Sequence, residues 1–115
     1  MPAVFYWLVT IGYMGLIYYL SSLSHIDLPD FPKNFDKVIH TFAYIPLAYL
    51  LYLSVQRSGV KKYVFLVAFG IAFLYGITDE LHQSAVPGRD AALGDVVADT
   101  LGALLGSFGA SIVKN

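Results

Sequence analysis

Four apolar runs separated by short polar links make up most of the chain. The first two, residues 3–23 and 38–55, each approach the roughly 20 residues that an α-helix needs to cross a hydrocarbon core. The third is uninterrupted only over 63–77 and the fourth only over 101–113, so each is several residues too short. To span, both must continue through acidic positions. The pattern therefore predicts four transmembrane helices, at about residues 3–23, 37–56, 62–83 and 93–113.

The composition is typical of a membrane protein and differs from that of a soluble domain. The absence of cysteine and the net charge exclude some kinds of chemistry and of partner. Hydrophobic residues make up 57% of the chain and charged residues 13%, unlike the balance of a soluble domain. Cysteine is absent, which excludes disulfides and thiolate chemistry, and a formal net charge of −1 gives no general attraction to nucleic acid. We therefore expect an all-α integral membrane fold, in which residues 1–115 form a single domain, a four-helix bundle with short loops. Successive helices should pack as antiparallel neighbours.

The basic residues predict an orientation. The link over residues 56–62 contains Arg57, Lys61 and Lys62 and no acidic residue, and Lys114 lies in the C-terminal segment. Lysine and arginine are enriched in cytoplasmic loops. This link and both termini are therefore expected in the cytoplasm, and the first and third links are expected to face outward.

Acidic residues fall within stretches that must cross the membrane. Asp79 and Glu80 end the third apolar run, and Asp95 and Asp99 begin the fourth. A charge at membrane depth is costly, so such residues mark either a functional site or a buried polar network. Because successive helices alternate in direction, these four and His40, early in the second helix, are expected near the same, outer leaflet.

A stripe of small residues follows the acids along the fourth helix. Asp95, Asp99, Gly102, Gly106 and Gly109 recur at intervals of four, three, four and three, and so share one helix face. Small residues allow membrane helices to approach closely. We expect this face to contact protein, with the fourth helix central to the bundle, and Gly102 and Gly106 also offer a surface for a homo-oligomer.

Three sequence elements occur in a specific order and spacing between residues 36 and 106. They are Asp36-Lys37-Val38-Ile39-His40; Asp79-Glu80-Leu81-His82-Gln83 followed by Val86-Pro87-Gly88-Arg89; and Asp95 followed by Gly102 and Gly106. In these elements the chain resembles the VanZ-like family, which is named for a teicoplanin-resistance factor of glycopeptide-resistant bacteria. The resemblance implies a multi-pass protein of the bacterial inner (cytoplasmic) membrane, with a role in the cell envelope and a link, in some members, to glycopeptide resistance.

The chain departs from the family pattern at one position. The resemblance implies asparagine four residues after Asp95, where this chain has Asp99. An amide both donates and accepts hydrogen bonds, whereas a carboxylate only accepts. A cation, a hydrogen-bond donor or protonation of Asp99 must therefore compensate.

The first hypothesis for the polar residues is a site for the headgroup of a membrane lipid or a lipid-linked envelope precursor. Arg89 and Lys37 would bind an anionic group. Asp79 or Glu80 with His40 would act as general acid or base, which would make the chain a membrane hydrolase or transferase. The expected catalytic residues are His40, Asp79 and Glu80, and the expected substrate-binding residues are Lys37, Gln83, Arg89, Asp95 and Asp99.

Other hypotheses use the same residues. A divalent cation is one, with His40, Asp79, Glu80 and Asp95 as candidate ligands, because carboxylates suit magnesium, calcium or manganese and a histidine admits zinc. An ion or proton relay is another, and a noncatalytic module that assembles with a partner or with itself is a third. The plainest alternative is a paired polar network that only fixes the helix register.

Overall fold

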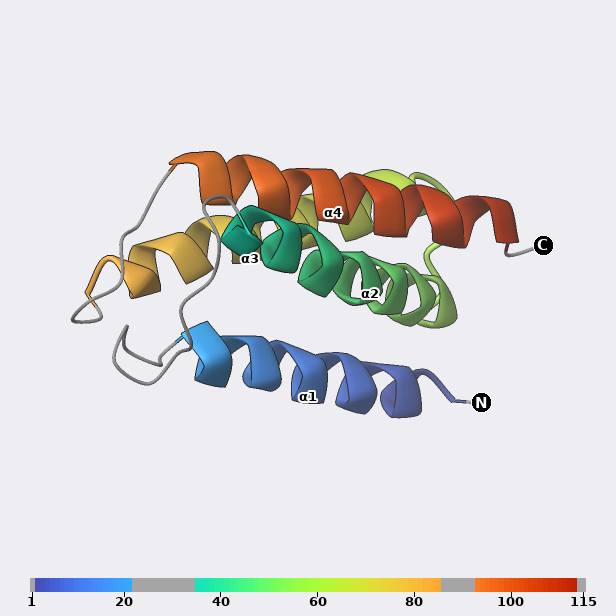
Figure 1. Cartoon of the computed structure of the whole chain (residues 1–115). Helices are drawn as coiled ribbons and strands as arrows, with labels where there is room; N and C mark the ends of the chain where they lie inside the picture. Colours follow the sequence, from blue (N-terminus) through green and yellow to red (C-terminus); the bar gives the residue numbers. More distant parts are fainter. Residues whose placement is uncertain (1, 22–34, 86–92, 114–115) are drawn as a thin grey trace.

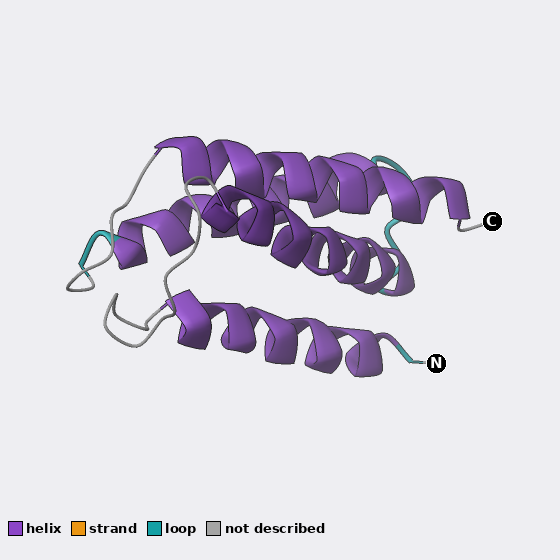
Figure 2. Cartoon of the chain, viewed as in Figure 1, coloured by secondary structure: helices purple, strands orange, loops and turns teal. Residues whose placement is uncertain are grey.

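The computed structural model describes residues 2–21, 35–85 and 93–113, which form an elongated bundle of four antiparallel helices (Figure 1). The described residues contain no strand (Figure 2). All four helices are long and apolar enough to cross a membrane. The predicted all-α, four-helix membrane fold is therefore confirmed. The helices are α1 (Ala3–Ser21), α2 (Phe35–Arg57), α3 (Val64–Gln83) and α4 (Leu93–Val113), close to the predicted bounds.

Helix α2 lies at the centre of the bundle. It packs against all three other helices and most extensively against α4, whereas the described parts of α1 and α4 do not contact each other. Successive helices are neighbours, as expected. The prediction that the fourth helix is central was wrong, because a stripe of small residues specifies close approach to one neighbour and not a place in the middle.

The contact between α2 and α4 is made partly by backbone. A Cβ atom at Gly102 would overlap the carbonyl oxygen of Thr41, and one at Gly106 would overlap that of Ile45. The Thr41 hydroxyl donates to the Ala98 carbonyl oxygen at 3.2 Å, which adds a polar link across the same seam. The Gly102 and Gly106 face, also predicted as a homo-oligomer surface, is covered by α2 of the same chain. A second copy cannot occupy it while this seam is closed.

Hydroxyl groups link helix α1 to the rest of the bundle, beside the apolar packing of Ile17 in the core. Thr10 and Ser54 share a hydrogen bond at 2.8 Å, and the Tyr13 hydroxyl donates to the Ala43 carbonyl oxygen at 2.6 Å. Much of the remaining α1 surface is exposed and apolar. Polar contacts of this kind hold helices together where lipid surrounds them, because lipid offers no hydrogen-bond partner. Hydroxyl groups therefore supply polar links between α1 and the rest of the bundle inside the apolar part of this half.

Candidate functional site

Polar side chains from three helices meet at the end of the bundle opposite both termini, where α2 and α4 begin and α3 ends (Figure 1). Helix α2 contributes His40 from its second turn, α3 contributes residues from its last turns, and α4 contributes residues from its first two turns. All the contributions from α3 and α4 are buried. We call this set the carboxylate cluster: His40, Asp79, Glu80, Gln83, Asp95 and Asp99.

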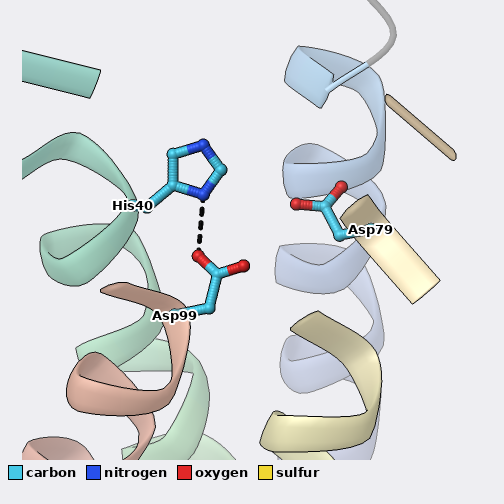
Figure 3. Close-up of side chains that lie close together, drawn as sticks. All are labelled: His40, Asp79 and Asp99. Atoms are coloured by element: carbon cyan, nitrogen blue, oxygen red, sulfur yellow. Dashed lines mark hydrogen bonds and ion pairs between the residues drawn. The ribbon is translucent and has the colours of Figure 1, made fainter. Parts of the chain in front are cut away.

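The imidazole of His40 connects α2 to α4. Its Nδ1 atom lies 2.7 Å from Oδ1 of Asp99 in a hydrogen bond (Figure 3). Its Nε2 atom lies 3.9 Å from Oδ2 of Asp95. Asp99 is only 1% exposed, so its charge is removed from solvent. A buried carboxylate needs such a partner, because taking an isolated charge out of water costs several kcal/mol.

The ends of the helices add a second electrostatic influence. The amino termini of α2 and α4 lie at this end, and Asp95 occupies the first turn of α4. The free N–H groups and partial positive charge of a helix amino terminus favour nearby carboxylates. This field favours Asp95, whereas the carboxyl end of α3 has the opposite effect on Asp79 and Glu80. The lysine and arginine side chains that the structure describes, Arg57, Lys61 and Lys62, lie at the opposite end.

Two buried carboxylate oxygens that border one gap in the cluster have no hydrogen-bond partner among the described residues. They are Oδ1 of Asp79 and Oδ2 of Asp99. The hydroxyl group of Tyr44 donates a hydrogen bond to the other oxygen of Asp79 at 3.3 Å. His40 forms a hydrogen bond with the other oxygen of Asp99. The carboxyl groups of the two aspartates face each other across the gap between α3 and α4 (Figure 3). Buried oxygens of this kind need a partner outside the described residues.

The same gap has the donor atoms of a cation site. His40, Asp79 and Asp99 each offer one ligand atom, and these atoms all lie within 4.8 Å of one another. The predicted cation set contained Glu80 and Asp95 and not Asp99, and it shares His40 and Asp79 with this group. Asp99 lies one turn farther into the bundle than Asp95, and that turn brings its carboxyl group opposite Asp79.

Comparison with known proteins places the chain in a family. A family model described as VanZ/LLP1 matches residues 4–114, nearly the whole chain. The chain belongs to the VanZ/LLP1 family. The predicted VanZ-like identity is thereby confirmed, and with the four apolar helices it makes this a VanZ-like membrane protein. Searches of curated proteins and of solved structures find no match.

The structure accounts for the aspartate at the position where the VanZ-like resemblance implies asparagine. The carboxylate of Asp99 can only accept hydrogen bonds, and His40 lies 2.7 Å away as a group that can donate one. His40 therefore supplies a donor for one of the two carboxylate oxygens of Asp99. A compensating donor was expected.

The remaining predicted residues of this VanZ/LLP1 chain divide into two groups. Glu80 and Gln83 are buried in the cluster beside Asp79. Lys37 belongs to the first turn of α2, but its side chain, like all of Arg89, lies outside the described residues. The hydrogen bond of His40 goes to Asp99, not to the expected catalytic partners in α3. The catalytic and substrate-binding roles stay predictions.

Two residues of the site were not predicted. Tyr44 is 1% exposed, donates to Asp79 and packs its ring against Tyr75, with centroids 6.3 Å apart. Gly76 faces Asp99, where a Cβ atom would lie 3.0 Å from the Asp99 Cβ atom. Helical spacing offered a signal for both, since Tyr44 follows His40 by four residues and Gly76 precedes Asp79 by three.

Proposed function

We propose that this VanZ-like protein binds the polar headgroup of a membrane lipid, or of a lipid-linked envelope precursor, at the carboxylate cluster. The observation that carries the proposal is the pair of buried oxygens in Asp79 and Asp99 that have no partner in the described part of the chain. Ionisable residues inside a membrane protein commonly mark a ligand or ion path.

The depth of the cluster suits a headgroup. At a rise of about 1.5 Å per residue, Asp95 lies about 3 Å and Asp99 about 9 Å from the start of α4. The acids are therefore close to the level where a lipid headgroup meets the acyl chains. A ligand with an apolar tail could lie along the exposed apolar helix surfaces while its headgroup enters the cluster.

The proposed orientation is outward for the cluster and cytoplasmic for both termini, in the bacterial inner membrane. Arg57, Lys61 and Lys62 lie at the end opposite the cluster, and basic residues favour the cytoplasmic side. An outward cluster would lie in the leaflet nearest the cell surface, where glycopeptide antibiotics act. A role in teicoplanin resistance is thus part of this proposal, as is processing of the ligand by His40 with Asp79 or Glu80.

An ion or proton relay has less support. All four acidic side chains that the structure describes belong to the carboxylate cluster, so they occupy one end of the bundle. The other half contains the hydroxyl pair of Thr10 and Ser54 among its described polar contacts. A conduit across the membrane would need titratable groups along its length.

A headgroup titration tests the proposal. The purified protein is unfolded by heat in detergent while short-chain lipids with identical acyl chains and different headgroups are added. A ligand present at 100 times its Kd should stabilise the wild type by about 2.7 kcal/mol. The double variant Asp79→Asn, Asp95→Asn should lose this gain, whereas Ser84→Ala, an exposed change just beyond α3, should keep it. Equal stabilisation of all three proteins by every headgroup would contradict the proposal.

A further inference from the structure

We infer that His40, Asp79 and Asp99 bind a divalent cation, and that this cation gives the carboxylate cluster its affinity for phosphate. The inference rests on the proposed function and names the chemistry of the ligand. The described side chains of the cluster carry four carboxyl groups and one imidazole. Phosphate is anionic and would be repelled by these acids. A bound cation reverses the local charge, as metal ions commonly do in phosphate sites.

The burial and direction of the side chains support a ligand between them. Asp79 is 5% exposed and Asp99 is 1% exposed, and each presents one oxygen without a partner in the described part of the chain. Figure 3 shows these carboxyl groups turned toward each other, with the ring of His40 beside Asp99. The three groups come from α2, α3 and α4, so a common ligand would tie three helices together.

The distances are compatible with a small cation after modest side-chain rotation. Bonds of about 2.0 to 2.2 Å place neighbouring ligand atoms about 3 to 4 Å apart. The candidate atoms of His40, Asp79 and Asp99 already lie within 4.8 Å of one another. Rotation about the carboxyl side chains would close the difference, and no helix would need to move.

Charge and donor type indicate which cation fits. Two carboxylates and a neutral imidazole carry a charge of −2, which a divalent ion balances inside a low-dielectric site. Mixed oxygen and nitrogen donors suit manganese or zinc better than calcium. Three protein ligands leave coordination positions open for water or a phosphate oxygen. Tyr44, which donates to Asp79, would orient that ligand from outside the coordination sphere.

The test uses Mn²⁺ as the probe and follows the loss of its free electron paramagnetic resonance signal on binding to the full chain in detergent. The wild type should bind one Mn²⁺. Asp79→Asn, Asp99→Asn should weaken binding by more than about 100-fold, and Tyr44→Phe by about 10-fold, since outer partners alone are typically worth 10–100-fold. Glu80→Gln removes a neighbouring buried acid from outside the ligand set and should weaken binding less than the double variant does.

Circular dichroism establishes that each variant is folded before it is scored. No Mn²⁺ binding by the folded wild type would overturn the inference, as would an equal loss in Glu80→Gln and in the double variant. Headgroup stabilisation in the absence of any cation would leave the proposed function standing without this inference. At saturating Mn²⁺, tighter binding of short-chain phosphatidic acid than of inorganic phosphate supports both. Equal binding of phosphatidic acid and inorganic phosphate would support the cation site and contradict the proposal that the cluster binds a lipid headgroup.

Discussion

Replacing Gly106 by alanine destabilises the bundle by about 3 kcal/mol, the upper part of the usual range for forcing extra volume into a packed core. A Cβ atom at this position would overlap the carbonyl oxygen of Ile45 and lie 2.9 Å from the Cβ atom of Ala48. The Ile45 carbonyl group is part of the backbone, so it cannot rotate away from the added Cβ atom as a flexible side chain can. Helix α4 would have to move away from α2 along their shared seam. Reversible unfolding in mixed micelles, followed by circular dichroism, measures the loss.

Gly109→Ala provides the matched control for this substitution. It makes the same chemical change on the same helix, but a Cβ atom there would meet nothing within 4 Å. Its effect should stay within about 0.5 kcal/mol of the wild type, as is usual where no close contact is affected. Similar losses in the two variants would contradict the close approach of α2 and α4.

Replacing His40 by leucine should cost about 3 kcal/mol, at the top of the range for leaving a buried hydrogen-bonding group without its partner. The change leaves the carboxylate of Asp99 at 1% exposure without the imidazole that lies 2.7 Å from it. The same unfolding measurement gives the loss. The cost arises because the remaining charge is neither solvated nor paired, and not because the pair itself is strongly stabilising.

The double variant His40→Leu, Asp99→Leu separates these causes. It removes both polar partners and fills the space with apolar groups, so most of the stability lost in His40→Leu should return. If the losses of stability measured for His40→Leu alone and for Asp99→Leu alone simply add in the double variant, the two residues are not energetically coupled. If His40→Leu alone is as stable as the wild type, Asp99 does not depend on His40.

The membrane fold and the location of the site followed from the lengths of the apolar runs. The third and fourth runs were too short to span alone, and this shortfall placed Asp79 and Asp95 inside the helices. The structure has both residues within α3 and α4, and both are buried. Run length is a reliable guide here because the hydrocarbon core imposes a fixed thickness on every helix.

The pairing of side chains within the cluster could not be predicted in the same way. His40 and Asp99 are 59 residues apart in the chain, and their contact depends on the rotation of α2 and α4 about their axes. Asp95 and Asp99 share one helix face but lie one turn, about 6 Å, apart along the axis, so the position of α4 along α2 also decides which of them is the nearest partner of His40. Gly102 and Gly106 predicted close approach of α4 to another helix, but they did not specify α2.

Tyr44 shows a different limit of sequence analysis. Aromatic residues are abundant in this chain, at 16%, and most have a plain explanation as lipid-facing or packing groups. Only the structure distinguishes the tyrosine whose hydroxyl reaches Asp79 from the others. Its position four residues after His40 places it on the same face of α2, but this helps only once that face is known to point into the bundle.

Native mass spectrometry tests the central claim, that the carboxylate cluster binds a ligand, most directly. The wild type and the Asp79→Asn, Asp95→Asn double variant are purified in the same mild detergent, and the masses retained by each folded protein are compared. We predict that the wild type retains a defined lipid, headgroup or cation and that the folded double variant does not. Identical spectra for the two proteins, with no species specific to the wild type, would contradict a ligand site and leave the cluster as a polar network that only holds the helices together.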